Sequence, residues 1–326
     1  MHNGSPRLRP TLRARSSARG AGGTDILEPM ALRLAGRLLM SSPVGDLLSA
    51  ALGSGVNYVM PSNEWSERAT KEELEQYERE GYFARTSVFN DVELKPVRDA
   101  VETIHRKIEA GARADDVEPH RKIDGKRYQK ILGSSVQWEW QDESTEIRTM
   151  EPYHHHDDRM NWMIDDVRLW GPARAIVGSE SISLFSDKLN FKRQNGAPFP
   201  WHQDNPYWAF ECQHLDQLIS VAIVLDDSTI ENGCLWLIPG SHKHGALDCF
   251  EDRGTVGRLY TDIDRYDLNE PKPMDLPAGS IVYFHGDIVH GSQGNRTAEK
   301  RRLLLLTYQP GGMARWQRND IRPVFG

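Results

Sequence analysis

One short motif in the chain has the residue types and spacing needed to hold a redox-active metal. In Trp201-His202-Gln203-Asp204 a histidine and a carboxylate are two residues apart, so a strand would present both on one face. Two histidines and one carboxylate form the facial triad that binds Fe(II) and leaves coordination positions open for a 2-oxo acid and O2. His290 lies far enough downstream for several antiparallel strands to return the chain beside this pair.

The His-x-Asp pattern alone is weak, because it occurs at four other places: His155/Asp157, His156/Asp158, His214/Asp216 and His285/Asp287. The first two lie in a polar tract before a predicted helix, and the third suits a solvated turn. The fourth lies near His290, but strand alternation would put residues 285 and 287 on one face and residue 290 on the other. The setting of His202 favours it, because an alternating strand and a Gly- and Pro-rich loop precede it.

A basic residue follows the distant histidine. Arg301 lies eleven residues after His290, where a further strand is predicted. A buried guanidinium needs an anionic partner, and its rigid fork suits the far carboxylate of 2-oxoglutarate. Since Lys300 and Arg302 adjoin Arg301, a surface position is an equally good interpretation from spacing alone. Arg302, on the opposite strand face, is the competing candidate.

The first half of the chain has helical patterns that could support such a site. Thr70 and Glu73 form a capping box that begins a helix, and Gly81 ends it. Apolar residues at helical spacing predict two more helices, over residues 91–109 and 159–177. The apolar stripe of the first of these comprises Val92, Leu94, Val97, Val101 and Ile104.

The second half has short strand-like runs separated by turn signals: SISLFSDKLNFK, QLISVAIVLDD, CLWLIPG, GSIVYFHG and RRLLLLTYQ. This order predicts a mainly β fold, a double-stranded β-helix (a jelly-roll or cupin-like barrel) with N-terminal helices packed on one sheet. We expect one domain over residues 25–326, with a helical jacket over about 64–178 and a jelly-roll core over about 179–312. A basic tail at 1–24, which we expect to be disordered, precedes it.

The first of these runs has two different faces. Ser186, Lys188, Asn190 and Lys192 share one face, and Phe185, Leu189 and Phe191 share the other, with Asp187 as the exception. We expect the apolar face to pack under the helices and the polar face to line the barrel cavity. We hypothesise that Lys188 contacts an anionic group of a substrate. A solvated edge strand is the alternative.

Bulk composition limits the classes of partner. A net charge of −7 with no basic stripe argues against nucleic acid, and no stretch approaches the ~18 apolar residues of a membrane span. The scattered cysteines, Cys212, Cys234 and Cys249, fit reduced thiols in an intracellular protein. A small-molecule partner is expected, and the oligomeric state is unknown from the sequence.

The N-terminal segment leaves the location open between two compartments. Residues 1–24 contain five arginines and no acid before Asp25. That composition suits a mitochondrial transit peptide, a disordered tail, or a chain whose true start is Met30 or Met40. We expect a cytoplasmic protein, with a mitochondrial location as the alternative if the segment is a transit peptide.

Several segments together carry a family pattern: Gly81-Tyr82 after the capped helix, Trp201-His202-Gln203-Asp204, Asn232-Gly233-Cys234-Leu235 through Ile238-Pro239-Gly240-Ser241-His242, and His290-Gly291-Ser292 with Arg301. Over roughly residues 68–312 the chain resembles the phytanoyl-CoA dioxygenase family, which includes ectoine hydroxylase and many natural-product hydroxylases. The resemblance implies a double-stranded β-helix in which His202, Asp204 and His290 bind catalytic iron and Arg301 binds the 5-carboxylate of 2-oxoglutarate.

Weaker correspondences follow from the same resemblance. Ser292 and Trp208 match positions that contact 2-oxoglutarate in ectoine hydroxylase-like enzymes, and Asn190 and Lys192 lie on a strand that supplies another such contact. Tyr207, among the aromatic residues after the iron motif, suits a ring-bearing or hydrophobic substrate. Halogenases of this fold lack the carboxylate ligand, so Asp204 favours hydroxylation, desaturation or ring formation.

The implied function is an Fe(II)- and 2-oxoglutarate-dependent dioxygenase, an oxidoreductase that uses O2 to oxidise a small molecule and releases succinate and CO2. The alternatives are a cupin-type metal enzyme that does not use 2-oxoglutarate, a non-catalytic ligand-binding protein on the same barrel, or a hydroxylase of proteins. The family acts on acyl-CoA thioesters, compatible solutes and products of secondary metabolism, and a fold does not choose among them.

Overall fold

The computed structural model of the protein describes residues 67–123, 125–141, 143–248 and 260–325. The chain divides into two compact units, Met1–Pro61 and Ser62–Gly326, and all described residues belong to the second. The basic tail predicted at residues 1–24 lies outside the described residues.

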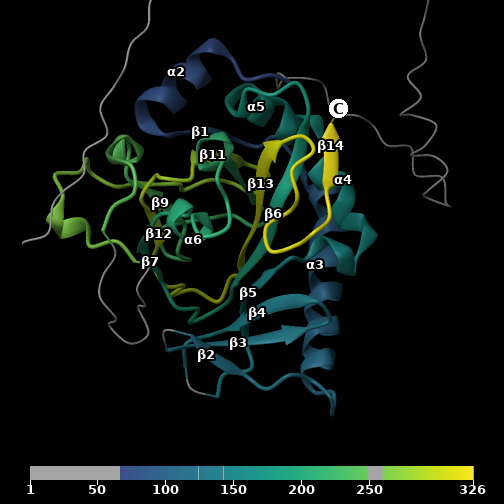
Figure 1. The fold of residues 1–326 in the computed structure, drawn as a ribbon. Helices are drawn as coiled ribbons and strands as arrows, with labels where there is room; N and C mark the ends of the chain where they lie inside the picture. Colours follow the sequence, from purple (N-terminus) through teal and green to yellow (C-terminus); the bar gives the residue numbers. More distant parts are fainter. Residues whose placement is uncertain (1–66, 124, 142, 249–259, 326) are drawn as a thin grey trace, which may run out of the picture. The chain divides into compact units, whose positions relative to one another are not determined.

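Two antiparallel sheets form the barrel (Figure 1). The larger sheet has ten strands in the order β1-β11-β8-β13-β6-β5-β4-β3-β2, with β14 paired to β6. Its strands are β1 (Tyr82–Arg85), β2 (Arg121–Ile123), β3 (Lys126–Ile131), β4 (Ser134–Trp138), β5 (Ile147–Glu151), β6 (Ile182–Lys192), β8 (Ile219–Val224), β11 (Ile281–His285), β13 (Arg301–Pro310) and β14 (Arg322–Phe325). The smaller sheet has the order β10-β9-β12-β7. Its strands are β7 (Phe199–His202), β9 (Leu235–Leu237), β10 (Lys272–Pro273) and β12 (His290–Ser292).

Helices cover the side of the larger sheet that faces away from the smaller sheet (Figure 1), except for the short helix Asn205–Trp208, whose Trp208 packs against Phe185 on the other face. The α-helices are α2 (Lys71–Glu80), α3 (Asp91–Ala112), α4 (Asn161–Asp165), α5 (Val167–Val177) and α6 (Asn205–Trp208). Single 3₁₀ turns occur at η1 (His154–His156), η2 (Asp158–Met160), η3 (Leu215–Gln217), η4 (Ser241–His244) and η6 (Ile263–Arg265). The capping box predicted at Thr70 is present, and Gly81 ends α2 with a φ of 82°, as expected for a left-handed cap.

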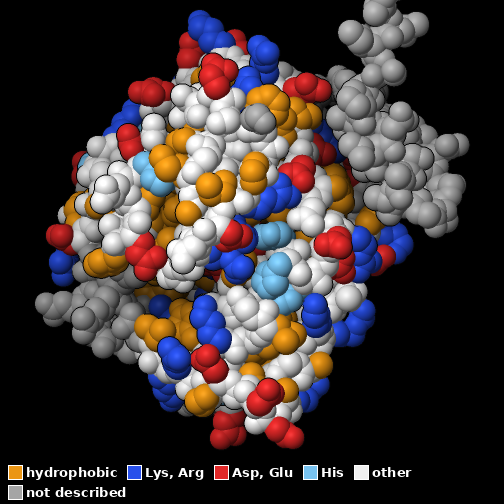
Figure 2. Space-filling view, turned by 45° about the vertical axis from the view of Figure 1, so that its right-hand side comes forward, with side chains coloured by type: hydrophobic (Ala, Val, Ile, Leu, Met, Phe, Trp, Pro, Cys, Tyr) orange, Lys and Arg blue, Asp and Glu red, His pale blue; other side chains and the backbone are white. Residues whose placement is uncertain are grey.

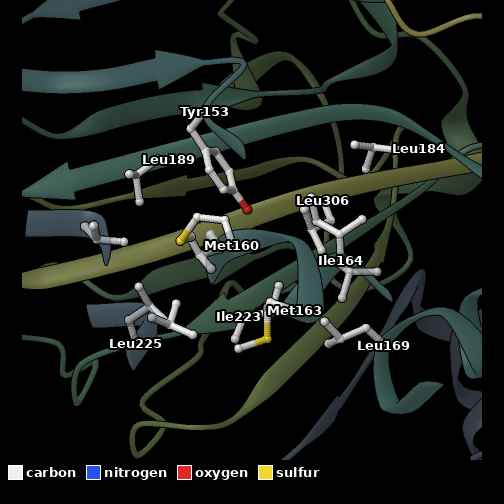
Figure 3. Packing of buried hydrophobic residues seen from close by; sticks show 14 of the residues in the cluster. Tyr153, Met160, Met163, Ile164, Leu169, Leu184, Leu189, Ile223, Leu225 and Leu306 are labelled. Carbon is white, nitrogen blue, oxygen red and sulfur yellow. The ribbon is translucent and has the colours of Figure 1, made fainter. Parts of the chain in front are cut away.

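The main core lies between these helices and the sheet. Side chains of residues 153–169 pack against side chains on the helix-facing side of β6, β8 and β13. Figure 3 labels members of both groups: Tyr153, Met160, Met163, Ile164 and Leu169 from the first, and Leu184, Leu189, Ile223, Leu225 and Leu306 from the strands or the residue next to them. All of them are buried. This layer supplies the hydrophobic stabilisation that keeps the large sheet rigid behind the cavity.

The predicted helical jacket differs from the structure in three places. Residues 121–151 contribute four strands, β2–β5, that extend the larger sheet. The helix predicted over residues 159–177 is broken at Asp166, whose extended backbone and side chain cap α5 through the N–H of Arg168. Val92 is 78% exposed, because two helical residues separate it from Leu94 by roughly 200° around the axis.

The two faces of β6 follow the predicted alternation except at one end. Leu189 and Phe191 lie in the core under the helices, whereas Phe185 packs against Trp208 on the cavity side, contrary to the prediction. The pairing of β6 with β13 shifts register here: Thr307 pairs with Ser186, but Tyr308 pairs with Leu184. A β-bulge inserts an extra residue and changes the direction of the side chains beyond it.

The surface carries charges of both signs. On the face shown in Figure 2, lysine and arginine side chains alternate with acidic ones and form no continuous basic stripe. Among the described residues, no helix has the length and apolar character that a membrane span needs.

Candidate metal centre and active site

The structure brings His202, Asp204 and His290 together at the rim of the smaller sheet. His202 ends β7 and His290 begins β12, and the two are direct partners in the antiparallel pairing of these strands. Asp204 follows two residues later, at the start of α6. One ligand atom from each residue lies within 4.8 Å of the others, and it is the one such group among the described residues. Two neutral imidazoles and a carboxylate around one point make a facial site for a divalent metal.

Backbone carbonyls orient both imidazoles. His202 Nδ1 lies 2.8 Å from Pro200 O, and His290 Nδ1 lies 3.0 Å from Ile288 O. A ring that donates from Nδ1 presents its Nε2 lone pair, which is the form that binds a metal. Burial, together with the nearby His290 ring, holds the pKa of His202 well below its usual range. The neutral imidazole is therefore the stable form, and each Nε2 lies about 4 Å or less from Asp204 Oδ1.

Two family-motif residues hold the ligand-bearing segments without pointing into the cavity. Gln203 donates from Nε2 to Gly245 O and Asp287 O, and its Oε1 accepts from Leu247 N–H. Ser241 Oγ accepts from Val289 N–H at 2.8 Å, one residue before His290. These bonds fix the loops on both sides of the smaller sheet, so the two histidines meet in a defined geometry.

The other His-x-Asp pairs are elsewhere. His285 lies in β11, and its Nδ1 accepts from Asp287 N–H. His214 contacts Gln309 Oε1 at 3.0 Å. His154, in the tract expected to be a polar loop, is instead buried, and its Nδ1 lies 3.0 Å from Asp187 Oδ1. The carboxylate of Asp187 needs buried partners, which explains why this histidine leaves the solvent.

Arg301 is the first residue of β13 and is only 1% exposed. Its Nη2 donates to Gly233 O at 2.6 Å, but its Nε is buried and has no hydrogen-bond partner. Within the described ranges no carboxylate is within ion-pair distance of this guanidinium. Residue 233 has no room for a side chain, because its φ is 80° and a Cβ would lie 2.3 Å from Gln293 O. A buried guanidinium with unused donors is a site for an anion.

Arg302, the competing candidate, points the other way. It donates to Asp226 at 2.8 and 2.6 Å and to Glu102 at 2.9 Å, on the side of α3. The alternation of β13 thus separates an arginine that has protein counter-charges from one that has none. The structure places Arg301 on the cavity side and Arg302 in the jacket.

Lys192 and Ser292 lie beside Arg301. Lys192 Nζ donates to Ser292 Oγ at 2.6 Å and also to Gln293 O. Burial, with the Arg301 and Arg148 guanidinium groups nearby, lowers the pKa of Lys192 to about 5. Burial also lowers the pKa of Arg301 to about 10. An anion bound here would stabilise both charged forms, so the cluster fits the distal carboxylate of a dicarboxylic acid.

The sequence comparison identifies the family. Residues 77–303 match the sequence profile of the family described as phytanoyl-CoA dioxygenase, which is more than half of the 326-residue chain. The chain belongs to the phytanoyl-CoA dioxygenase family. The family and the class of enzyme predicted from the sequence, a 2-oxoglutarate-dependent dioxygenase, are confirmed.

Two relatives illustrate the similarity. The protein named probable alpha-ketoglutarate-dependent hypophosphite dioxygenase of Stutzerimonas stutzeri is 28% identical over 244 residues, which cover 73% of this chain and 77% of that protein. L-proline trans-4-hydroxylase of Streptomyces griseoviridis is 26% identical over 271 residues, covering 77% of this chain and 89% of that protein.

A solved structure establishes the fold. The crystal structure of EctD from S. alaskensis with 2-oxoglutarate and 5-hydroxyectoine matches with a TM-score of 0.56 and 22% identity, covering 78% of this chain and 79% of that chain. The double-stranded β-helix expected from the sequence is therefore confirmed. The His-Asp-His group and the uncompensated Arg301 fit Fe(II) and 2-oxoglutarate as the cofactors of this family member.

A cavity between the two sheets connects these groups. Its empty volume is about 1080 Å³ when the open solvent at its mouth is included. The predicted residues Lys188, Asn190, Tyr207, Trp208 and Ser292 line it together with the His-Asp-His group and Arg301, whereas Lys192 reaches it through Ser292. The individual roles assigned to these residues stay predictions.

Polar wall residues that the sequence did not predict include Lys126, Tyr128, Gln137 and Glu151. They come from β3, β4 and β5, in the stretch assigned to the helical jacket. A signal was present, because Leu132-Gly133 is a two-residue loop between two short strand-like runs, and β3 and β4 pair across it as a hairpin. The wall also includes Tyr260 and Trp316, from a loop and from the C-terminal segment.

Proposed function

We propose that this dioxygenase hydroxylates a small molecule that carries an anionic group. In this proposal His202, Asp204 and His290 hold Fe(II), and Arg301, with Lys192 and Ser292, holds the distal carboxylate of 2-oxoglutarate. Bound Fe(II) and 2-oxoglutarate supply the oxidising chemistry, in which 2-oxoglutarate and O2 become succinate and CO2 and one oxygen atom enters the substrate.

The proposal of an anionic substrate rests on Lys188, whose charged group has no partner in the described part of the protein. This residue lies in the middle of β6 and lines the same cavity as the His-Asp-His group. Across the described part of the chain, Lys188 makes no hydrogen bond and no ion pair. Its positive charge contributes to the lowered pKa of His202, so the ammonium group is near the metal site. An ammonium directed into a cavity favours an anionic ligand.

The named relatives support this class of substrate. Hypophosphite is an anion, and proline carries a carboxylate. A cupin-type enzyme that does not use 2-oxoglutarate is less well supported, because it would leave the buried Arg301 guanidinium without an anion.

Succinate formation tests the proposal. Wild-type protein with Fe(II), 2-oxoglutarate and O2 would be given small carboxylates and phosphonates, each beside its uncharged amide or ester. We expect an anionic member to stimulate succinate formation above the substrate-free rate, and Lys188→Met to weaken that stimulation by about 10- to 100-fold. The requirement for 2-oxoglutarate should not change in this variant. Equal stimulation by the uncharged counterparts would contradict the proposal.

A further inference from the structure

A second charged residue faces the cavity beside Lys188. Glu151 ends β5 and lines the cavity wall. Ser186 Oγ donates a hydrogen bond to Glu151 Oε1. The second carboxylate oxygen accepts no hydrogen bond from the residues that the structure describes, and it is not among their buried, unsatisfied atoms. This oxygen therefore opens onto the cavity.

Glu151 and Lys188 are cross-strand neighbours that form no ion pair, although their charges attract each other. The pairing of β5 with β6 matches Thr149 with Asn190 and Met150 with Leu189. Extending this register by one residue puts Glu151 opposite Lys188, where Cβ atoms are roughly 5 Å apart. No ion pair joins these two side chains, each of which lies within the described ranges. The wall thus presents one negative and one positive pole side by side.

Asp187 anchors the chain that follows Glu151. Asp187 Oδ2 accepts from the N–H groups of Tyr153 and His154, at 2.7 and 2.9 Å. These bonds fix the chain immediately after Glu151. The enclosed position raises the pKa of Glu151, and the nearby Lys188 charge and the bond from Ser186 oppose that rise. A cation bound at the open oxygen would favour the ionised carboxylate further.

The charges of the loaded cavity leave these two poles unmatched. The metal would neutralise Asp204, and the distal carboxylate of 2-oxoglutarate would neutralise Arg301. Lys126, Lys188 and Glu151 then remain as charged residues of the wall. Neither Lys188 nor Glu151 has an ion-pair partner among the described residues. A purely anionic substrate would satisfy Lys188 but would bring a second negative charge beside Glu151, which is unfavourable.

We infer that Glu151 is a specificity-determining residue that binds a cationic group of the substrate, so that the substrate is a small zwitterion with an ammonium group close to a carboxylate or phosphonate. Amino acids and aminophosphonates are the matching chemical class. The inference rests on the proposed function and narrows its substrate class. The short separation of the poles requires that the two substrate charges also lie close together.

Matched ligand pairs test this inference. The probes are L-proline with tetrahydrofuran-2-carboxylate, and 2-aminoethylphosphonate with propylphosphonate; in each pair the anionic group is kept and the ammonium is lost. Binding would be measured anaerobically on the Fe(II)- and 2-oxoglutarate-loaded protein, by the change in its visible charge-transfer band. We expect at least one zwitterion to bind at least ~10-fold more tightly than its anionic partner, as a charge-assisted hydrogen bond allows.

Variants of Glu151 and Lys188 distinguish the contributions of the two charges to binding. Glu151→Gln should abolish the preference for the zwitterion while keeping the charge-transfer band, whereas Lys188→Met should weaken both members of a pair. Ser186→Ala, which removes only the bond to Glu151, should reduce the preference in part and serves as the test if Glu151→Gln does not fold. If no zwitterion exceeds its partner, or if Glu151→Gln keeps the preference, the inference is wrong. Absence of the band in wild-type protein would instead contradict the proposed function.

Discussion

The two faces of β6 and β13 differ in whether their charged side chains have partners within the protein. On the face covered by helices, Arg302 is hydrogen-bonded to Asp226 and Glu102. Asp187 accepts hydrogen bonds from two backbone N–H groups, and the His154 ring lies within ion-pair distance of its carboxylate. On the cavity face, Arg301 retains a buried N–H without a partner, and Lys188 forms no ion pair with a described residue.

The difference shows which charges serve the fold and which await a ligand. Removing a charged group from water is unfavourable unless a partner compensates for it. Where the protein provides that partner, as it does for Arg302, the charge stabilises the fold. Where the protein provides none, a bound molecule is the natural partner. The charged side chains without protein partners on the cavity face therefore indicate which charges the cofactors and the substrate carry.

The largest expected effect is on metal binding. Asp204→Ala removes the carboxylate of the His-Asp-His group, and loss of even an outer partner of a metal ligand costs about 10- to 100-fold. We expect Fe(II)-dependent succinate formation to fall by more than ~100-fold. Asp287→Ala is the matched control, because Asp287 belongs to another His-x-Asp pair, outside the metal cluster. Equal losses in both variants would contradict the assignment of the metal ligands.

The neighbouring arginines should have separable effects. Arg301→Ala should raise the concentration of 2-oxoglutarate needed for half-maximal succinate formation by roughly 10- to 100-fold, because a hydrogen bond to a charged group contributes about 1.5–3 kcal/mol. Its urea stability should change little or rise, since an uncompensated buried charge is removed. A 2-oxoglutarate requirement like that of wild type would argue against an anion site at Arg301.

Arg302→Ala should show the reverse pattern. It removes the hydrogen bonds to Asp226 and one of those to Glu102, which keeps its bond from Lys300. We expect the free energy of unfolding to fall by roughly 1–3 kcal/mol. The half-maximal 2-oxoglutarate concentration should stay at the wild-type value. Urea denaturation followed by tryptophan fluorescence would measure the first quantity. A stable Arg302→Ala variant with weakened 2-oxoglutarate binding would reverse the roles of the two faces.

The smallest expected effect concerns His105, a buried histidine that is neutral in the folded protein near neutral pH. His105 of α3 packs against Phe191, and its Nε2 is buried without a partner. Burial lowers the pKa of His105 to about 4. The unfolded chain therefore binds a proton, with a pKa of ~6.5, that the folded protein does not bind until lower pH. Stability should fall as the pH drops from ~6.5 toward 4.

His105→Leu should make this acid-induced loss shallower. Urea unfolding at several pH values between 7 and 4 would compare the slopes of the two proteins. An unchanged slope would mean that His105 is protonated as readily in the folded protein as in the unfolded chain, with Glu109, 3.5 Å from its Nδ1, as the counter-charge.

Local signals explain how much of this site the sequence predicts. The capping box at Thr70 and the strand alternation around His202 need only nearby residues, so the elements that carry them are found from the sequence. The placement of Arg301 against Arg302 needs the direction of β13, which spacing alone leaves open. The pole at Glu151 depends on the register between β5 and β6, and no local pattern specifies that register. The bulge that redirects Phe185 is undetectable for the same reason.

Anaerobic titration of the metal-free protein with Fe(II) and 2-oxoglutarate tests the central claim most directly, because the visible metal-to-ligand charge-transfer band reports a chelating 2-oxo acid on an open facial site. We expect the band in wild-type protein and in Arg302→Ala, no band in His202→Ala, and a band in Arg301→Ala only at much higher 2-oxoglutarate. Absence of the band from folded, iron-loaded wild-type protein would contradict the claim that the uncompensated groups of the cavity are the cofactor site.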